Sequence, residues 1–165
     1  MATPLQIRIK KSADGRTSLS CTRADGTTTW QRQQGSQAAF FPRHDLTHYA
    51  VENALGLESG FFPLVACGWD LTDFGTPWPR GPLPLAANVS EMIVSFFDRE
   101  RASGELGTAA DLNEVVRSYC VQHGIGAPTF DDSDVARVRQ ARGALFQRWD
   151  ALSSGEALEL SFEQK

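Results

Sequence analysis

Cysteine is scarce in this sequence, and its three residues lie far apart. Cys21, Cys67 and Cys120 form no Cys-x-x-Cys pair, which argues against both a structural zinc knuckle and a disulfide framework. Long apolar runs are missing too, since no stretch approaches the roughly 18 to 20 apolar residues of a membrane span. Residues 1–8 lack the basic start and apolar run of a signal peptide. We therefore expect a cytoplasmic protein with no membrane partner.

A basic excess is also absent, because the chain has a formal net charge of −4 and a pI of about 5.3. Nucleic-acid-binding proteins usually show the opposite balance, so we expect no nucleic-acid partner. The sequence contains no internal repeat and no low-complexity region. Its 165 residues, 41% of them hydrophobic, match one ordinary globular domain. We interpret residues 1–165 as a single domain.

Both ends of the sequence have the pattern of β-strands. Residues 5–10 alternate between apolar and polar side chains, which is the period of a half-buried strand. Asp-Gly turns at 14–15 and 25–26 divide residues 5–33 into a predicted three-stranded meander. Residues 158–163 alternate in the same way, with an acidic outer face where the first strand is basic. Opposite charges on neighbouring strands attract, so we expect the two terminal strands to pair.

The residues between these strands favour helices. The predicted helices cover 44–55, 61–74, 88–101, a segment from Thr108 to just before Gly124, and a last one that starts at Asp132 or Ser133. Residues 61–74 are apolar on most sides and should be buried. Asn88 and Glu91 resemble a capping box at, or just inside, the start of the third helix. The pattern predicts an α+β fold, in which a small antiparallel sheet, the N-terminal meander plus the C-terminal strand, packs with about five central helices.

The segment with the clearest chemical potential is His-Asp-Leu-Thr-His at 44–48, followed by Glu52. Two histidines four residues apart lie on one face of a helix, where both imidazoles can bind one metal ion. His44 lies at the positive end of the predicted helix, which favours neutral imidazole, the form that binds metals. Glu52 lies in the last turn, where its charge opposes the helix dipole. Residues that break a local rule in this way often serve a function.

A third ligand is expected from the second predicted helix. The short connection at 56–60 predicts that the first two helices form an antiparallel hairpin. This hairpin would bring Asp70 level with His48 and Asp73 near Asp45, so Asp70 or Asp73 is the predicted third ligand. Two histidines and one carboxylate suit zinc, iron or manganese in a site with an open position for water or substrate.

The string His-Asp-x-x-His is similar to the His-Glu-x-x-His motif of the zincin metalloproteases over these five residues. The resemblance implies that His44 and His48 bind zinc. Asp45 stands where that family has its glutamate general base and is one methylene shorter. The His-Asp dipeptide also resembles the phosphohydrolase family named for it, but no histidine precedes His44 to match that family's upstream histidine.

The leading hypothesis is a metal-binding protein that acts as a metal-dependent hydrolase on a small molecule. Asp45 or Glu52 would position or deprotonate a metal-bound water. Glu52 lies about 12 Å along the helix axis from His44, so it would orient His48 rather than bind the ion. The alternative is a non-catalytic ligand-binding or protein-interaction domain with a polar helix face and no metal. The same residues could also form a capped helix with a solvated polar face. Nothing in the sequence indicates an oligomeric state.

Three further side chains have two interpretations each. Cys67 could be a nucleophile with His48 as its base, but free cysteines are usually buried in the core. His123 lies at the end of a predicted helix, where the helix dipole stabilises an imidazolium. We favour this interpretation over a role as another metal ligand. Trp78, between two prolines, would either lie over a pocket or brace a loop.

Overall fold

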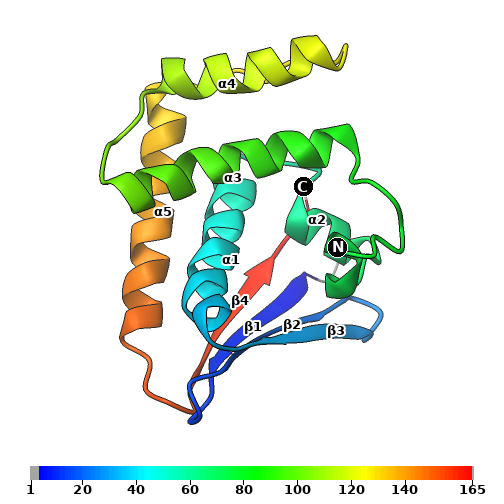
Figure 1. Cartoon of the computed structure of the whole chain (residues 1–165), viewed down its shortest axis with the longest axis vertical. Coiled ribbons are helices and arrows are strands. Elements are labelled where there is room, and N and C mark those ends of the chain that lie inside the picture. The colour runs from blue at the N-terminus through cyan, green and yellow to red at the C-terminus, as the bar shows by residue number, and fades with distance from the viewer. Residues whose placement is uncertain (1–3, 165) are drawn as a thin grey trace.

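The computed structural model describes residues 4–164, so residues 1–3 of the segment examined for a signal peptide lie outside it. The described residues form an antiparallel sheet with the strand order β3-β2-β1-β4. Its strands are β1 (Leu5–Lys11), β2 (Thr17–Thr22), β3 (Thr28–Gln33) and β4 (Ala157–Phe162). Figure 1 shows this sheet at one end of the molecule, with the helices beside and above it.

The two terminal strands pair as predicted. β4 runs antiparallel to β1 with Glu159 opposite Arg8, and Nε of Arg8 lies 3.4 Å from Oε1 of Glu159. Apolar residues such as Ile7 and Leu160 are buried on one face of the sheet, as the period of two requires. The predicted α+β class, the N-terminal meander and the C-terminal strand are all confirmed.

Five α-helices and one short 3-10 helix lie between β3 and β4 in the described residues. They are α1 (Ser36–Ala54), α2 (Phe61–Ala66), the 3-10 helix η1 (Leu71–Phe74), α3 (Leu85–Ser103), α4 (Ala109–Gln122) and α5 (Asp132–Asp150). In Figure 1, α3 crosses near one end of α1, and α4 lies beyond α3. No helix in this part of the chain is long and apolar enough to cross a membrane.

Helix α1 lies between two apolar clusters. Leu46 and Ala50 contribute to a cluster with the inner face of the sheet, α2 and the end of α5. Val51 belongs to a second cluster, which α3, α4 and the start of α5 form. Because α1 is covered from both sides, polar side chains on its remaining surface are also brought into the interior.

Helix α1 begins eight residues before the predicted start at position 44, and it ends at Ala54. It continues through Pro42, which lacks a backbone N–H and removes one hydrogen bond from the helix. Pro42 is buried, and the burial of its apolar ring offsets that loss. The predicted helix over 88–101 is also longer and covers Leu85–Ser103.

The single helix predicted over 61–74 is wrong. Helix α2 ends at Ala66, and the chain turns at Gly68, whose φ of 114° is a conformation that favours glycine. A new start follows at Asp70, the N-cap of η1. The predicted hairpin of two long helices therefore does not form, and the residues after Gly68 take a different course.

Candidate metal centre

The polar stripe of α1 is buried rather than solvated. Asp45 is 5% exposed, His48 2% and Glu52 1%, whereas His44 is partly exposed. This burial excludes the solvated polar helix face that we considered as an alternative. A group of ionisable side chains held in the interior needs charge partners or a function, because charges without partners are costly there.

Glu52 links the end of α1 to the start of α2. Its carboxylate accepts the backbone N–H groups of Phe61 at 2.8 Å and Phe62 at 2.9 Å, which have no partner within the first turn of a helix. Oε2 of Glu52 also lies 3.0 Å from Nδ1 of His48. Gly60 permits this close approach, since a Cβ at that position would lie 2.5 Å from Oε2 of Glu52. The sequence-based expectation that Glu52 orients His48 agrees with this geometry.

His48 lies between two carboxylates. Its Nδ1 atom faces Glu52, and its Nε2 atom lies 3.2 Å from Oε1 of Glu91 on α3. Burial lowers the pKa of His48, but the hydrogen bonds and charges of Glu52 and Glu91 outweigh burial and raise the pKa well above 6.5. Burial raises the pKa of Glu91, yet His48 and His44 lower it below its usual value.

His44 is held in a similar way by Asp98 of α3. Nδ1 of His44 lies 2.6 Å from Oδ2 of Asp98, and Nη2 of Arg101 lies 3.4 Å from the other oxygen of Asp98. Burial raises the pKa of Asp98, but the His44 hydrogen bond and the charges of His44 and Arg101 lower it overall. The rings of His44 and His48 meet edge to face, 4.7 Å between centroids. Since a carboxylate holds each Nδ1, the Nε2 atoms are the ones available to a metal.

His44, His48 and Glu91 form a group that could hold a metal ion. One ligand atom from each lies within 4.8 Å of the other two. Ligands about 2.1 Å from a tetrahedral zinc ion would be about 3.4 Å apart, so a small inward movement of these side chains would complete the site. The two predicted histidines therefore lie close to each other, and Glu91 supplies a carboxylate beside them.

Asp70 and Asp73, the predicted third ligands, lie in a different network and are not members of this group. Asp70 accepts Nη2 of Arg23 at 2.9 Å, while Asp73 accepts Nε of Arg80 at 2.6 Å and the backbone N–H of Asp70 at 2.7 Å. Together they cap η1. The turn at Gly68 explains this outcome, because it ends the helix that would have carried both side chains toward α1.

The side chain of Asp45 is buried and forms no hydrogen bond or ion pair with another of the described residues. Burial raises the pKa of Asp45 to about 7, and the positive charges of His44 and His48 only partly oppose that effect. Asp45 also lines the cavity beside the histidines. A carboxyl group with these properties is well suited to exchange a proton with a bound molecule.

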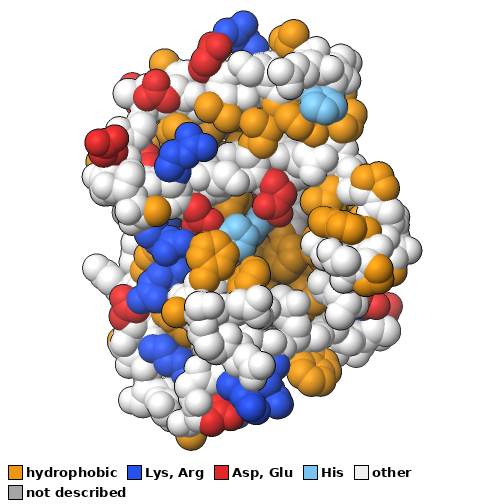
Figure 2. Space-filling view, in the orientation of Figure 1, with side chains coloured by type: hydrophobic (Ala, Val, Ile, Leu, Met, Phe, Trp, Pro, Cys, Tyr) orange, Lys and Arg blue, Asp and Glu red, His pale blue; other side chains and the backbone are white. Residues whose placement is uncertain are grey.

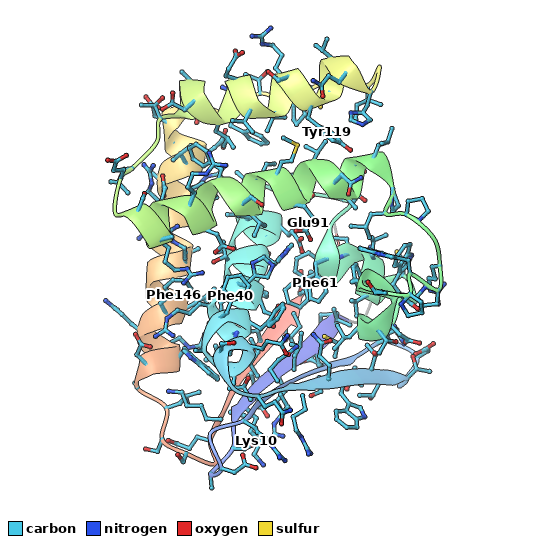
Figure 3. All side chains as sticks on the ribbon, in the orientation of Figure 1. Lys10, Phe40, Phe61, Glu91, Tyr119 and Phe146 are labelled. Atoms are coloured by element: carbon cyan, nitrogen blue, oxygen red, sulfur yellow. The ribbon has the colours of Figure 1, made fainter. Side chains whose placement is uncertain are left out.

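The site opens into a cavity of about 590 Å³. Its walls come from α1, α2, β3, η1, the loop after η1 and α3, with aromatic rings at Phe41, Phe61, Phe74 and Trp78. Figure 2 shows a histidine between acidic side chains, next to a hollow with hydrophobic walls. In Figure 3, Glu91 of α3 and Phe61 of α2 lie near each other beside α1. Trp78 therefore does line a pocket.

Glu91 and Asp98 are the side chains of the candidate site that the sequence interpretation missed. We interpreted Glu91 as part of a capping box, but α3 begins at Leu85 after Pro84, and the Glu91 side chain reaches His48 instead. The spacing of seven residues between Glu91 and Asp98 places both on one face of a helix. That spacing was the signal in the sequence that could have identified them.

Two other candidates lie outside the group. Cys67 is exposed, which corrects the expectation of a core residue, and its Sγ atom lies 3.2 Å from Nε2 of Gln164. His123 follows the last residue of α4, where its Nδ1 atom lies 2.9 Å from the carbonyl oxygen of Tyr119. His123 thus caps the end of its own helix.

Comparisons with known proteins identify no relative of this chain. No family model, no curated protein and no solved structure matches it. The functional interpretation therefore depends on the geometry and chemistry of the group around His44, His48 and Glu91.

Proposed function

We propose that this protein is a metal-dependent hydrolase that binds one divalent transition-metal ion through His44, His48 and Glu91. The observation that carries the proposal is the approach of these three ligand atoms to within 4.8 Å of one another at the edge of a cavity. Two histidines and one carboxylate are a common ligand set of catalytic zinc and of non-haem iron. Zinc, iron and manganese are therefore the candidate ions.

The charge balance of the region supports a bound cation. Four carboxylates, those of Asp45, Glu52, Glu91 and Asp98, surround the two imidazoles. Arg101 adds a positive charge, and its contact is with Asp98. Protonation of His48 compensates part of this negative charge when no ion is bound, and a divalent ion beside Glu91 would take over that role when the imidazoles are neutral ligands.

The surrounding carboxylates support metal binding by the histidines in a second way. A histidine that ligates a metal commonly donates its other N–H to a carboxylate, which fixes the tautomer and makes the ring a better ligand. Glu52 and Asp98 have this relationship to His48 and His44.

Asp45 is the proposed proton acceptor. The ion, when bound, would supply the positive charge that makes water more acidic. The carboxylate of Asp45 would accept a proton from the water molecule that attacks the electrophilic atom of a small-molecule substrate. As the bond to the leaving group breaks, protonated Asp45 would return the proton to that group, which restores the carboxylate.

Metal analysis of protein purified without a histidine tag tests the proposal. We expect about one equivalent of zinc, iron or manganese, or micromolar binding of zinc by metal-free protein in titration calorimetry. Glu91→Gln should lower the affinity at least tenfold, and His48→Ala should abolish binding. Glu114→Gln, which removes an exposed carboxylate paired with Arg117, is the matched control.

Circular dichroism of each variant separates loss of a ligand from loss of the fold. The metal proposal fails if the purified protein contains no stoichiometric metal and binds none at micromolar concentration. It also fails if Glu91→Gln stays folded and binds zinc as tightly as the unaltered protein. Either result would favour a non-catalytic binding domain.

A further inference from the structure

The walls of the cavity carry information about the molecule that would bind there. One side is formed by the candidate metal group on α1 and α3, and the floor and rim are formed by aromatic rings. Phe61 is 9% exposed and forms part of the floor, whereas Trp78 is 44% exposed and stands at the rim. A volume of about 590 Å³ is in the range of pockets that enclose small organic molecules. Flat apolar groups fit between such rings.

The lining carries two carboxylates, Asp45 and Glu91, and two imidazoles that are already paired with carboxylates. No lysine or arginine is among the described residues that line the cavity, while Asp45 and Glu91 are. Arg80 and Arg101, which are near this region, contact Asp73 and Asp98 instead. An anionic substrate would find no lysine or arginine to replace its lost hydration, and the two imidazoles already have carboxylate partners. The carboxylates of Asp45 and Glu91 would repel it.

The wall that β3 contributes is polar but uncharged. Gln31 and Gln33 are two residues apart on one strand, so their side chains share a face, and both line the cavity. Neither side-chain amide forms a hydrogen bond within the described residues. Each amide offers both donors and an acceptor, the complement of a carbonyl or amide group on a ligand.

We propose that the cavity selects an uncharged carboxylic ester or amide that carries a flat apolar group, and that it excludes phosphate esters and other anions. The inference rests on the proposed hydrolase function for the reaction. For the ligand class, it rests only on the aromatic floor and rim, the glutamine wall and the absence of lysine and arginine from the described lining. The apolar group would lie against Phe61 and Trp78, with the carbonyl group between the glutamine wall and the candidate metal group.

The reaction would be a hydrolysis in which atoms balance without another reactant. Hydroxide derived from water adds to the carbonyl carbon and forms a new C–O bond. The bond from that carbon to the alcohol or amine breaks, and the leaving group takes the proton that the attacking water gave up. The products are a carboxylic acid and an alcohol or amine.

A binding experiment with metal-free protein tests the ligand class independently of any catalysis. Benzamide and benzoate have the same ring and similar size but differ in charge, and each can be titrated into EDTA-treated protein at pH 8. We expect saturable binding of benzamide and at least tenfold weaker binding of benzoate. Trp78→Ala should weaken benzamide binding about threefold to tenfold, the usual range for one aromatic contact.

Two variants make this result specific to the cavity. Trp30→Ala removes a 60% exposed tryptophan that does not line the cavity and should leave benzamide binding unchanged. Gln33→Arg introduces a cation into the wall and should strengthen benzoate binding at least tenfold. The inference is overturned if benzamide does not bind, if benzoate binds as tightly to the unaltered protein, or if Trp78→Ala has no effect.

An activity experiment with zinc-loaded protein tests the reaction class. Phenyl acetate and phenyl phosphate release the same alcohol, and we expect a higher kcat/KM for phenyl acetate. Faster hydrolysis of phenyl phosphate would overturn the inference while the hydrolase function stands. If benzamide binds as expected and neither ester is hydrolysed, the hydrolase function fails while the ligand class stands.

Discussion

The imidazole of His48 and the carboxylate of Glu52 lie 3.0 Å apart, and neither side chain is more than 2% exposed. The same carboxylate accepts backbone N–H groups of Phe61 and Phe62 at the start of α2. Glu52 thus fixes the orientation of a candidate metal ligand and the position of the next helix at once. Changes at or near Glu52 should therefore affect metal binding and stability together.

Glu52→Gln should weaken metal binding by about 10-fold to 100-fold and lower the free energy of unfolding by about 1–3 kcal/mol. The amide keeps one acceptor oxygen, so a buried N–H group loses its partner. Calorimetric zinc titration and urea unfolding of the metal-free protein measure the two effects. Glu58→Gln is the control at an exposed position in the connection between α1 and α2. Unchanged values for Glu52→Gln would contradict the double role.

Gly60→Ala should reproduce the effects of the Glu52 variant without altering any polar group. The new Cβ would lie 2.5 Å from Oε2 of Glu52 and must displace that carboxylate from His48. Gly143 provides a matched comparison, since a Cβ there would meet nothing within 4 Å. Gly143→Ala, in the middle of α5, should raise stability by about 0.5–1 kcal/mol. If both alanine variants are equally stable, the close approach at Gly60 does not constrain Glu52.

Asp98→Asn should weaken metal binding by about 10-fold to 100-fold while the fold is retained. An asparagine that donates to Nδ1 of His44 favours the tautomer with the proton on Nε2, the atom that would face the metal. Titration calorimetry with zinc measures the loss, and circular dichroism checks the fold. Asp150→Asn, which removes an ion pair between Arg43 and an exposed aspartate, should bind zinc normally. Full affinity in Asp98→Asn would show that His44 is not a ligand through Nε2.

The cysteines should differ in their reaction with iodoacetamide between pH 7 and pH 9. Burial, and then the nearby charge of Asp45, raise the pKa of Cys21 to about 12, so its reactive thiolate is scarce throughout this range. Cys120 is buried, whereas Cys67 is exposed. Peptide mapping by mass spectrometry should find alkylation at Cys67 in the folded protein and at all three residues in guanidinium chloride. Alkylation of Cys21 in the folded protein at the rate of Cys67 would contradict the burial of the inner sheet face.

The sheet could be predicted from the sequence because its signals are local. Alternation of apolar and polar residues defines which face of each strand is buried, and Asp-Gly pairs mark the turns of the meander. The pairing of the first and last strands followed from their opposite charges, and Arg8 and Glu159 confirm it. The starts of α4 and α5 were also predictable, because Thr108 and Asp131 form capping boxes with residues three positions later.

The absence of the predicted helix hairpin could not be foreseen from the sequence, because it depends on the conformation of Gly68. An apolar run with helical periodicity gives no indication that one glycine within it will adopt a positive φ. Once the chain turned there, Asp70 and Asp73 came near Arg23 and Arg80 and formed ion pairs with them. The prediction of a third ligand failed with the hairpin on which it depended.

The two histidines of the candidate site were predictable from their spacing, whereas their partners were not. His44 and Asp98 are 54 residues apart in the sequence, and Glu91 meets His48 only because α3 crosses α1. Such a crossing depends on how apolar surfaces such as Val51 and the inner face of α3 pack. No local pattern encodes it.

The unpaired carboxyl of Asp45 has a consequence for how this protein would respond to selection. An acid group in the interior without a hydrogen-bond partner makes the folded state less stable than an apolar side chain of similar size would. Proteins keep such groups where a function requires them. Selection for heat resistance alone, with no demand for activity, should therefore accumulate apolar replacements at this position. A position where substitution raises thermal stability but lowers activity would then identify the reactive centre, even if the substrate is not known.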